Sequence, residues 1–104
     1  MRQISVEEAR DLIAGPGAPQ LLDCRQAWEH DVCHIAGDVL IPLGELEERA
    51  AELDPSRPVI VYCHAGVRSI NGAVLLERVG FTAMSMRGGI DQWSLRIDPT
   101  VPRY

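Results

Sequence analysis

The chain has 104 residues, enough for one folded domain with one hydrophobic core and too few for two. Its 46% hydrophobic and 24% charged residues exclude intrinsic disorder, and its net charge of −5 excludes a broad nucleic-acid-binding surface, which needs an excess of basic residues. All ten basic residues are Arg, so chemistry that needs a Schiff-base lysine or a phosphate-loop lysine is excluded as well.

The predicted elements alternate between helices and strands. The first helix begins at Ser5-Val6-Glu7-Glu8, which has the pattern of a capping box, and it ends at Gly15-Pro16. After it we expect a buried strand over 20–24, a helical turn over 26–31, a strand over 39–41 and an acidic amphipathic helix over 45–53.

The central strand of the predicted sheet is Val59-Ile60-Val61-Tyr62, because it has no polar alternation and so suits a strand covered on both faces. A helix over 69–79, a strand over 82–86 and a last short helix that opens at Gly88-Gly89 and carries Trp93 follow it. Strands that alternate with helices predict an α/β fold with a mainly parallel sheet in one domain, residues 1–104.

The N-terminus has no apolar export segment, and no apolar run is long enough to span a membrane. The three cysteines, Cys24, Cys33 and Cys63, are an odd number at irregular spacing, which does not suit a disulfide framework. We therefore expect reduced thiols, a cytoplasmic location, and neither membrane nor nucleic-acid partners.

The loop that follows the central strand carries the candidate chemistry. Ligands of open α/β sheets bind beyond the carboxyl ends of the strands, and here Cys63 begins a short loop that contains Gly66 and leads directly into a helix. Successive loop amides, the positive end of the helix and the guanidinium of Arg68 would together favour the thiolate form of Cys63. A lone cysteine is usually a small buried hydrophobe, but this position and these neighbours favour a nucleophile.

Several segments together resemble a rhodanese-like single domain. They are Leu21-Leu22-Asp23-Cys24-Arg25, His34-Ile35-Ala36-Gly37 followed by Ile41-Pro42-Leu43, the loop from Cys63 to Ser69, and Gly88-Gly89-Ile90-Asp91-Gln92-Trp93. Their order and spacing cover almost the whole chain. The ending over 98–104 is also similar to the tails of rhodanese domains found beside sulfur-carrier activating enzymes.

The resemblance implies five parallel strands flanked by helices and a sulfurtransferase that carries a persulfide on Cys63. It implies a small sulfur donor (thiosulfate or a persulfide), an acceptor that is cyanide, a thiol or a protein, and no metal or organic cofactor. The substrate-binding residues would be those of the loop: His64, Ala65, Gly66, Val67, Arg68 and Ser69. His64 suits either an acid or donor-binding group or a solvent-facing spacer, and Arg68 is expected to help bind anionic donors.

Three positions depart from the family pattern. Cys24 replaces a common aliphatic residue, Asp38 replaces a small one, and Cys33 stands where a glycine usually precedes the His-Ile pair. The last departure puts the local backbone in question, since a Cβ disfavours the positive φ that glycine allows.

Two other functions remain open. Cysteine-dependent phosphatases have the same strand, loop and helix order but place five residues between Cys and Arg, whereas four separate Cys63 from Arg68 here, which suits one sulfur atom better than a phosphate. A non-catalytic sulfur-carrier or regulatory module is the other alternative. A thiosulfate:cyanide assay separates an active domain from an inactive one.

Other chemistry-bearing residues have simpler structural interpretations. His30, Cys33 and His34 suggest a metal site, but no second ligand pair is evident, so we expect none. Asp23 and Arg25 could reach the rim of the active site, although a structural ion pair is favoured. We expect Trp28 and Trp93 to pack in the core or between helices, and the acidic run Glu45, Glu47, Glu48 and Glu52 to form a solvated helix face.

Cys24 and Cys33 are expected to be dispensable for catalysis, because burial in an apolar strand makes a thiol inert and a turn lacks the setting that activates Cys63. The rival hypothesis is that one of them resolves the Cys63 persulfide by forming a disulfide. It requires the strand that carries Cys24 to lie beside the central strand.

Overall fold

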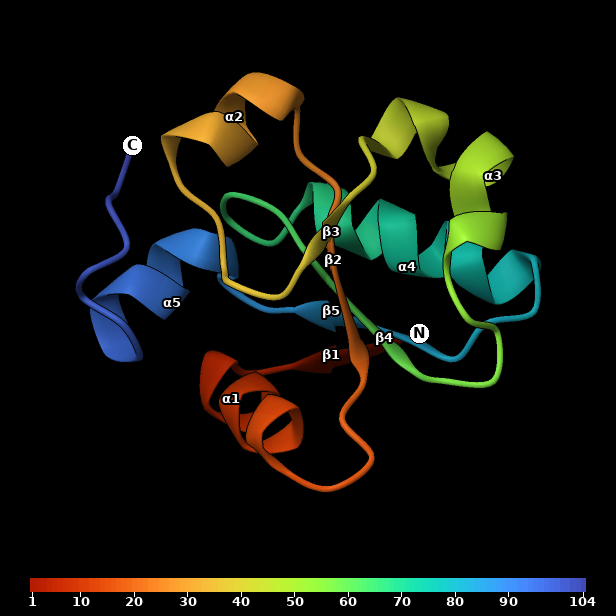
Figure 1. Cartoon of the computed structure of the whole chain (residues 1–104), viewed down its shortest axis with the longest axis horizontal. Coiled ribbons are helices and arrows are strands. Elements are labelled where there is room, and N and C mark those ends of the chain that lie inside the picture. Colours follow the sequence, from red (N-terminus) through yellow and green to blue (C-terminus); the bar gives the residue numbers. More distant parts are fainter.

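A five-stranded parallel sheet with helices on both faces forms the molecule (Figure 1). The computed structural model describes all residues, 1–104. The strands lie in the order β1-β5-β4-β2-β3, with β1 (Arg2–Ile4), β2 (Gln20–Asp23), β3 (Val39–Leu40), β4 (Val59–Tyr62) and β5 (Ala83–Met86). The helices are α1 (Val6–Ala14), α2 (Ala27–Val32), α3 (Leu46–Arg49), α4 (Arg68–Arg78) and α5 (Gly89–Arg96). This architecture confirms the predicted fold class.

The central strand β4 separates two apolar cores. Helices α1 and α5 cover one face of the sheet and α3 and α4 the other (Figure 1). Because side chains alternate along a strand, Ile60 packs in the core under α1 and α5, whereas Val59 and Val61 pack in the core under α4. All four residues of β4 are buried. Because β4 is the middle strand of the five, the loop that follows it begins at the centre of the carboxyl end of the sheet.

Two elements differ from the sequence-based expectation. The edge strand β1 was not predicted, because two of its three residues are exposed and it has no apolar pattern of its own. The helix expected over 45–53 is only the short α3, with a 3-10 turn before it (Leu43–Glu45) and another after it (Ala50–Glu52).

The two tryptophans have different surroundings. Trp93 is buried against the core under α5, as expected. The expectation for Trp28 is wrong: its side chain is 61% exposed on α2, and the edge of its ring meets Tyr104 with a centroid distance of 6.1 Å. The six residues of α2 bury few of their own side chains, so Trp28 has no core to enter.

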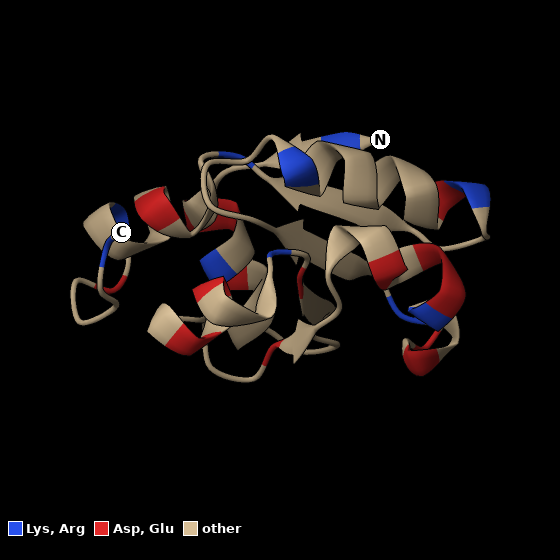
Figure 2. Ribbon diagram, turned by 90° about the horizontal axis from the view of Figure 1, so that it is seen from above, with Lys and Arg blue, Asp and Glu red and all other residues tan.

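The acidic segment that contains α3 faces solvent. Arg49 lies between Glu45 and Glu52, with ion-pair distances of 3.1 and 2.7 Å, and the basic positions are scattered over several elements rather than gathered on one face (Figure 2). None of the helices has the length and apolar character needed to cross a bilayer.

Candidate active site

Cys63 lies directly after β4, and its side chain is only 1% exposed. The backbone amides of Gly66 and Ser69 both donate to its Sγ, at 3.2 and 3.3 Å. The second of these amides belongs to the first turn of α4, so the positive end of that helix is directed at the sulfur. The loop therefore forms a cradle of N–H groups around one sulfur atom.

Two buried hydroxyls lie behind the thiol. The Cys63 thiol contacts Ser69 Oγ at 3.5 Å, and Ser69 Oγ is hydrogen-bonded to Ser85 Oγ at 2.7 Å. Ser85 comes from the neighbouring strand β5 and was not singled out from the sequence. Its signal was a hydroxyl inside an otherwise apolar strand, Ala83-Met84-Ser85-Met86.

The start of α5 holds the other side of the loop. The amides of Ile90 and Asp91 donate to the carbonyl oxygens of Cys63 and His64, at 2.9 and 3.1 Å. Gly89 has a φ of 60°, and a Cβ there would overlap both carbonyl oxygens. The backbones of the loop and of α5 can approach this closely only because that residue is glycine.

The Arg68 side chain is paired with a carboxylate. Its guanidinium makes two hydrogen bonds to the carboxylate of Glu29 on α2, at 2.7 and 2.9 Å. These bonds are the main cause that lowers the pKa of Glu29 to about 2, and they raise the pKa of Arg68. The cation expected over the loop thus has an acidic partner that the sequence did not reveal.

The outer part of the loop is open on one side and covered by the C-terminal tail on the other. Ala65 and Val67 are exposed, with Val67 at 70%. His64 is half-buried, and its ring stacks on that of Tyr104 with a centroid distance of 4.2 Å. The tail reaches this position by running back along α5 toward α2 (Figure 1), and the Tyr104 hydroxyl donates to the carboxylate of Glu29.

Asp23 and Arg25 lie below the surface rather than at the rim, and both side chains are fully buried. The guanidinium of Arg25 donates to both carboxylate oxygens of Asp23, at 2.9 and 2.8 Å. It also donates to the carbonyl of Cys33 at 2.6 Å and to the Tyr104 hydroxyl at 2.9 Å. The pair joins the end of β2 to the segment after α2 and to the tail.

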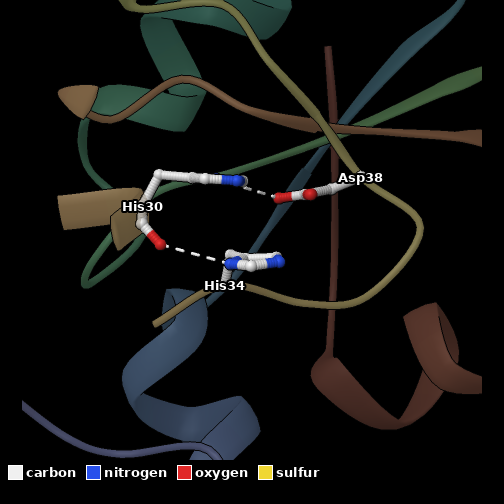
Figure 3. A group of neighbouring side chains, drawn as sticks. All are labelled: His30, His34 and Asp38. Carbon is white, nitrogen blue, oxygen red and sulfur yellow. Dashed lines mark hydrogen bonds and ion pairs between the residues drawn. The ribbon is translucent and has the colours of Figure 1, made fainter. Parts of the chain in front are cut away.

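His30, His34 and Asp38 are the side chains that could hold a cation (Figure 3). His30 Nδ1 lies 3.0 Å from Asp23 and 3.5 Å from Asp38, and His34 Nδ1 lies 3.2 Å from the carbonyl of His30. The two imidazole rings are stacked with a centroid distance of 4.0 Å. In this arrangement each ligand group already has a hydrogen-bond partner in the protein.

Cys33 does not join that group. Its side chain is buried in the core under α1 and α5. Its φ is −164°, an extended conformation that any residue adopts, so the replacement of the usual glycine causes no backbone strain there. Asp38, the other departure in this segment, accepts a hydrogen bond from the Tyr62 hydroxyl at 2.6 Å.

Comparison with known proteins agrees with the fold. Residues 5–96 match the family described as Rhodanese-like domain, so the chain belongs to that family. It is 33% identical to YrkF of Bacillus subtilis, named as a sulfur carrier protein, with 88% of this chain and 50% of YrkF aligned. It is 33% identical to MoeZ of Mycobacterium tuberculosis, named as an adenylyltransferase/sulfurtransferase, with 97% of this chain and 26% of MoeZ aligned. The chain therefore spans half the length of one of these relatives and about a quarter of the other.

Among solved structures, the human single-domain sulfurtransferase TSTD1 superposes with a TM-score of 0.79 at 26% identity, covering 92% of this chain and 97% of that one. The resemblance drawn from the sequence is thus confirmed at the level of the family. Sulfurtransferase-related proteins are its relatives.

Proposed function

We propose that this protein is a sulfurtransferase that carries sulfane sulfur as a persulfide on Cys63. The observation that supports it is the pair of amide hydrogen bonds to Sγ, from Gly66 and Ser69, in a loop that the positive end of α4 faces. Such donors stabilise a thiolate, and they also stabilise the negative charge of a persulfide.

The reaction would have two steps. The Cys63 thiolate attacks the outer sulfur of thiosulfate, the sulfur–sulfur bond of the donor breaks, and sulfite leaves with the electron pair. A nucleophilic acceptor, cyanide in the assay or a thiol of a small molecule or protein, then attacks the outer sulfur of the persulfide and regenerates the thiolate. Both steps use only groups of this chain and its substrates.

The size of the loop favours this reaction over phosphate chemistry. Only His64, Ala65, Gly66 and Val67 separate Cys63 from Arg68, one residue fewer than in the loop of cysteine-dependent phosphatases, and the shorter loop suits one sulfur atom better than a phosphate. A non-catalytic sulfur-carrier role is the second candidate, and it is supported by the similarity to YrkF, which is named as a sulfur carrier protein.

The test is to incubate the reduced protein with thiosulfate without air and to measure its mass. We expect a gain of one sulfur atom, located on the peptide that contains Cys63, and its release as thiocyanate when cyanide is added. A protein that accepts sulfur only from a partner protein, without thiosulfate:cyanide turnover, would support the carrier role. Hydrolysis of an aryl phosphate that vanadate inhibits would support a phosphatase.

Because Arg68 is paired with Glu29, we expect substitutions of these two residues to have opposite effects on donor binding. Arg68→Ala should raise the KM for thiosulfate by roughly tenfold, since a charge-assisted contact contributes about 1–3 kcal/mol. Glu29→Gln should lower that KM, because the amide can still hydrogen-bond to Arg68 while the competing negative charge is removed. Steady-state kinetics of both variants at one ionic strength check this. Equal KM values would mean that the loop amides bind the donor without help from Arg68.

A further inference from the structure

Cys24 lies beside Cys63 at the carboxyl ends of the neighbouring strands β2 and β4. In the parallel pairing of β2 and β4, Asp23 lies opposite Tyr62. The amide of Cys24 donates to the carbonyl of Tyr62 at 3.1 Å, so the ladder continues to the end of both strands. Each cysteine is the next residue of its own strand, which makes Cys24 and Cys63 neighbours across adjacent strands.

The two side chains also lie on the same face. Leu22 and Cys24 from one chain segment and Val61 and Cys63 from the other belong to one apolar core, as the alternation of side chains along a strand requires. Each cysteine is 1% exposed, and both are free thiols. Adjacent strands are about 4.8 Å apart, which is inside the range of roughly 4.4–6.8 Å that the Cα atoms of a disulfide span.

We propose that Cys24 is a resolving cysteine: when no acceptor arrives, it attacks the inner sulfur of the Cys63 persulfide, forms a Cys24–Cys63 disulfide and releases the outer sulfur as hydrogen sulfide. This inference rests on the proposed function. The new bond joins the two Sγ atoms, and the sulfur–sulfur bond of the persulfide breaks. The outer sulfur leaves with the electron pair and takes the proton from Cys24. The two thiols are oxidised and the sulfane sulfur is reduced, so an external dithiol must reduce the disulfide before the next cycle.

The surroundings of Cys24 set the order of events. Burial is the main cause that raises its pKa far above the ordinary value for a thiol, and the neighbouring Cys63 raises it further. The Cys24 thiolate is therefore scarce, and an acceptor that enters through the exposed side of the loop reacts first. Sulfur transfer to cyanide thus does not need Cys24, whereas a persulfide left without an acceptor is resolved slowly.

The experiment follows a loaded protein without any acceptor. Reduced protein is loaded with thiosulfate under anaerobic conditions, desalted and incubated, and its mass and the released sulfide are measured over time. In the unmodified protein the added sulfur should disappear, one sulfide should appear for each sulfur lost, and the final mass should be two hydrogens below that of the reduced protein.

Peptide mapping identifies the disulfide. Trypsin cuts after Arg but not at the Arg57–Pro58 bond, so the three cysteines fall on the separate peptides 11–25, 26–49 and 50–68. The expected linked species joins 11–25 to 50–68. Diamide, which oxidises dithiols directly, should produce the same linked pair from protein that was never loaded with sulfur, and so tests the geometry independently of sulfur transfer.

The variants are Cys24→Ala and Cys24→Val, the second because valine suits a buried strand. Both should take up sulfur normally, and their persulfide should last at least about tenfold longer, because the intramolecular nucleophile is gone. Cys33→Ala is the matched control: it removes another buried thiol from the opposite core and should behave like the unmodified protein.

Two results would overturn the inference, and they are distinguishable. If Cys63 takes up sulfur but the persulfide decays equally fast with and without Cys24, or the linked peptides do not form, Cys24 is not a resolving cysteine. If no sulfur is taken up by any of the proteins, the proposed function itself fails, whatever the result of the diamide experiment.

Discussion

Cys63→Ser should abolish sulfur transfer, with a loss of thiosulfate:cyanide turnover on the order of a thousandfold or more, as for other removed nucleophiles. The serine hydroxyl occupies the same place after β4, but it stays protonated at neutral pH and cannot form a persulfide. The fold should survive, because the substitution replaces one small buried atom by another. The measurements are thiocyanate production and the mass of the protein after incubation with thiosulfate.

The control for this result is the double variant Cys24→Ala, Cys33→Ala. It removes both other thiols and should keep near-normal thiosulfate:cyanide turnover, because neither thiol lies in the loop that holds Cys63. It should lose roughly 1 kcal/mol of stability at most for the small changes in packing. Turnover that persists in Cys63→Ser, or that disappears in the double variant while the fold is intact, would contradict Cys63 as the sole nucleophile of the transfer reaction.

Asp23→Ala should lower the free energy of unfolding by about 3–5 kcal/mol, because it leaves the fully buried guanidinium of Arg25 without its countercharge. It also removes the partner of His30, whose Nδ1 lies 3.0 Å from the carboxylate. Urea unfolding followed by circular dichroism measures the change. Glu52→Ala, which breaks an ion pair with Arg49 on the exposed acidic segment, is the matched control and should move the unfolding midpoint little.

The same variant also decides between a structural and a rim role for Asp23. A structural role predicts a large loss of stability with an unchanged KM for thiosulfate under conditions where the variant remains folded. The opposite pattern, normal stability with a raised KM for thiosulfate, would mean that Asp23 contributes to donor binding.

The central part of the fold was predictable because its signals are local. The apolar run of β4, the glycine in the loop and the immediate start of α4 are all contiguous in sequence. Contiguity is also why the position of Cys63 at the end of a central strand could be predicted. Parallel order followed from the alternation of strands and helices.

What sequence reasoning missed depends on contacts between distant segments. Glu29 was not singled out from the sequence, because it lies on the predicted helical turn over 26–31, and only the fold brings it to Arg68, 39 positions later. Tyr104 reaches the loop because the tail turns back toward α2, which no local pattern encodes. The edge strand β1 forms where β5 offers it backbone partners, and only Ile4 of its three residues is buried.

The hydrogen bonds from α5 to the carbonyls of Cys63 and His64 bear on how this chemistry could be moved to another protein. The segment from Cys63 to Ser69 is continuous in sequence, yet two of its carbonyl groups are hydrogen-bonded to the amides of Ile90 and Asp91 on α5. A graft of the loop alone onto a different parallel sheet would leave those carbonyls without donors and the loop free to open. A functional graft must therefore also include the first turn of α5, with a glycine at the position of Gly89.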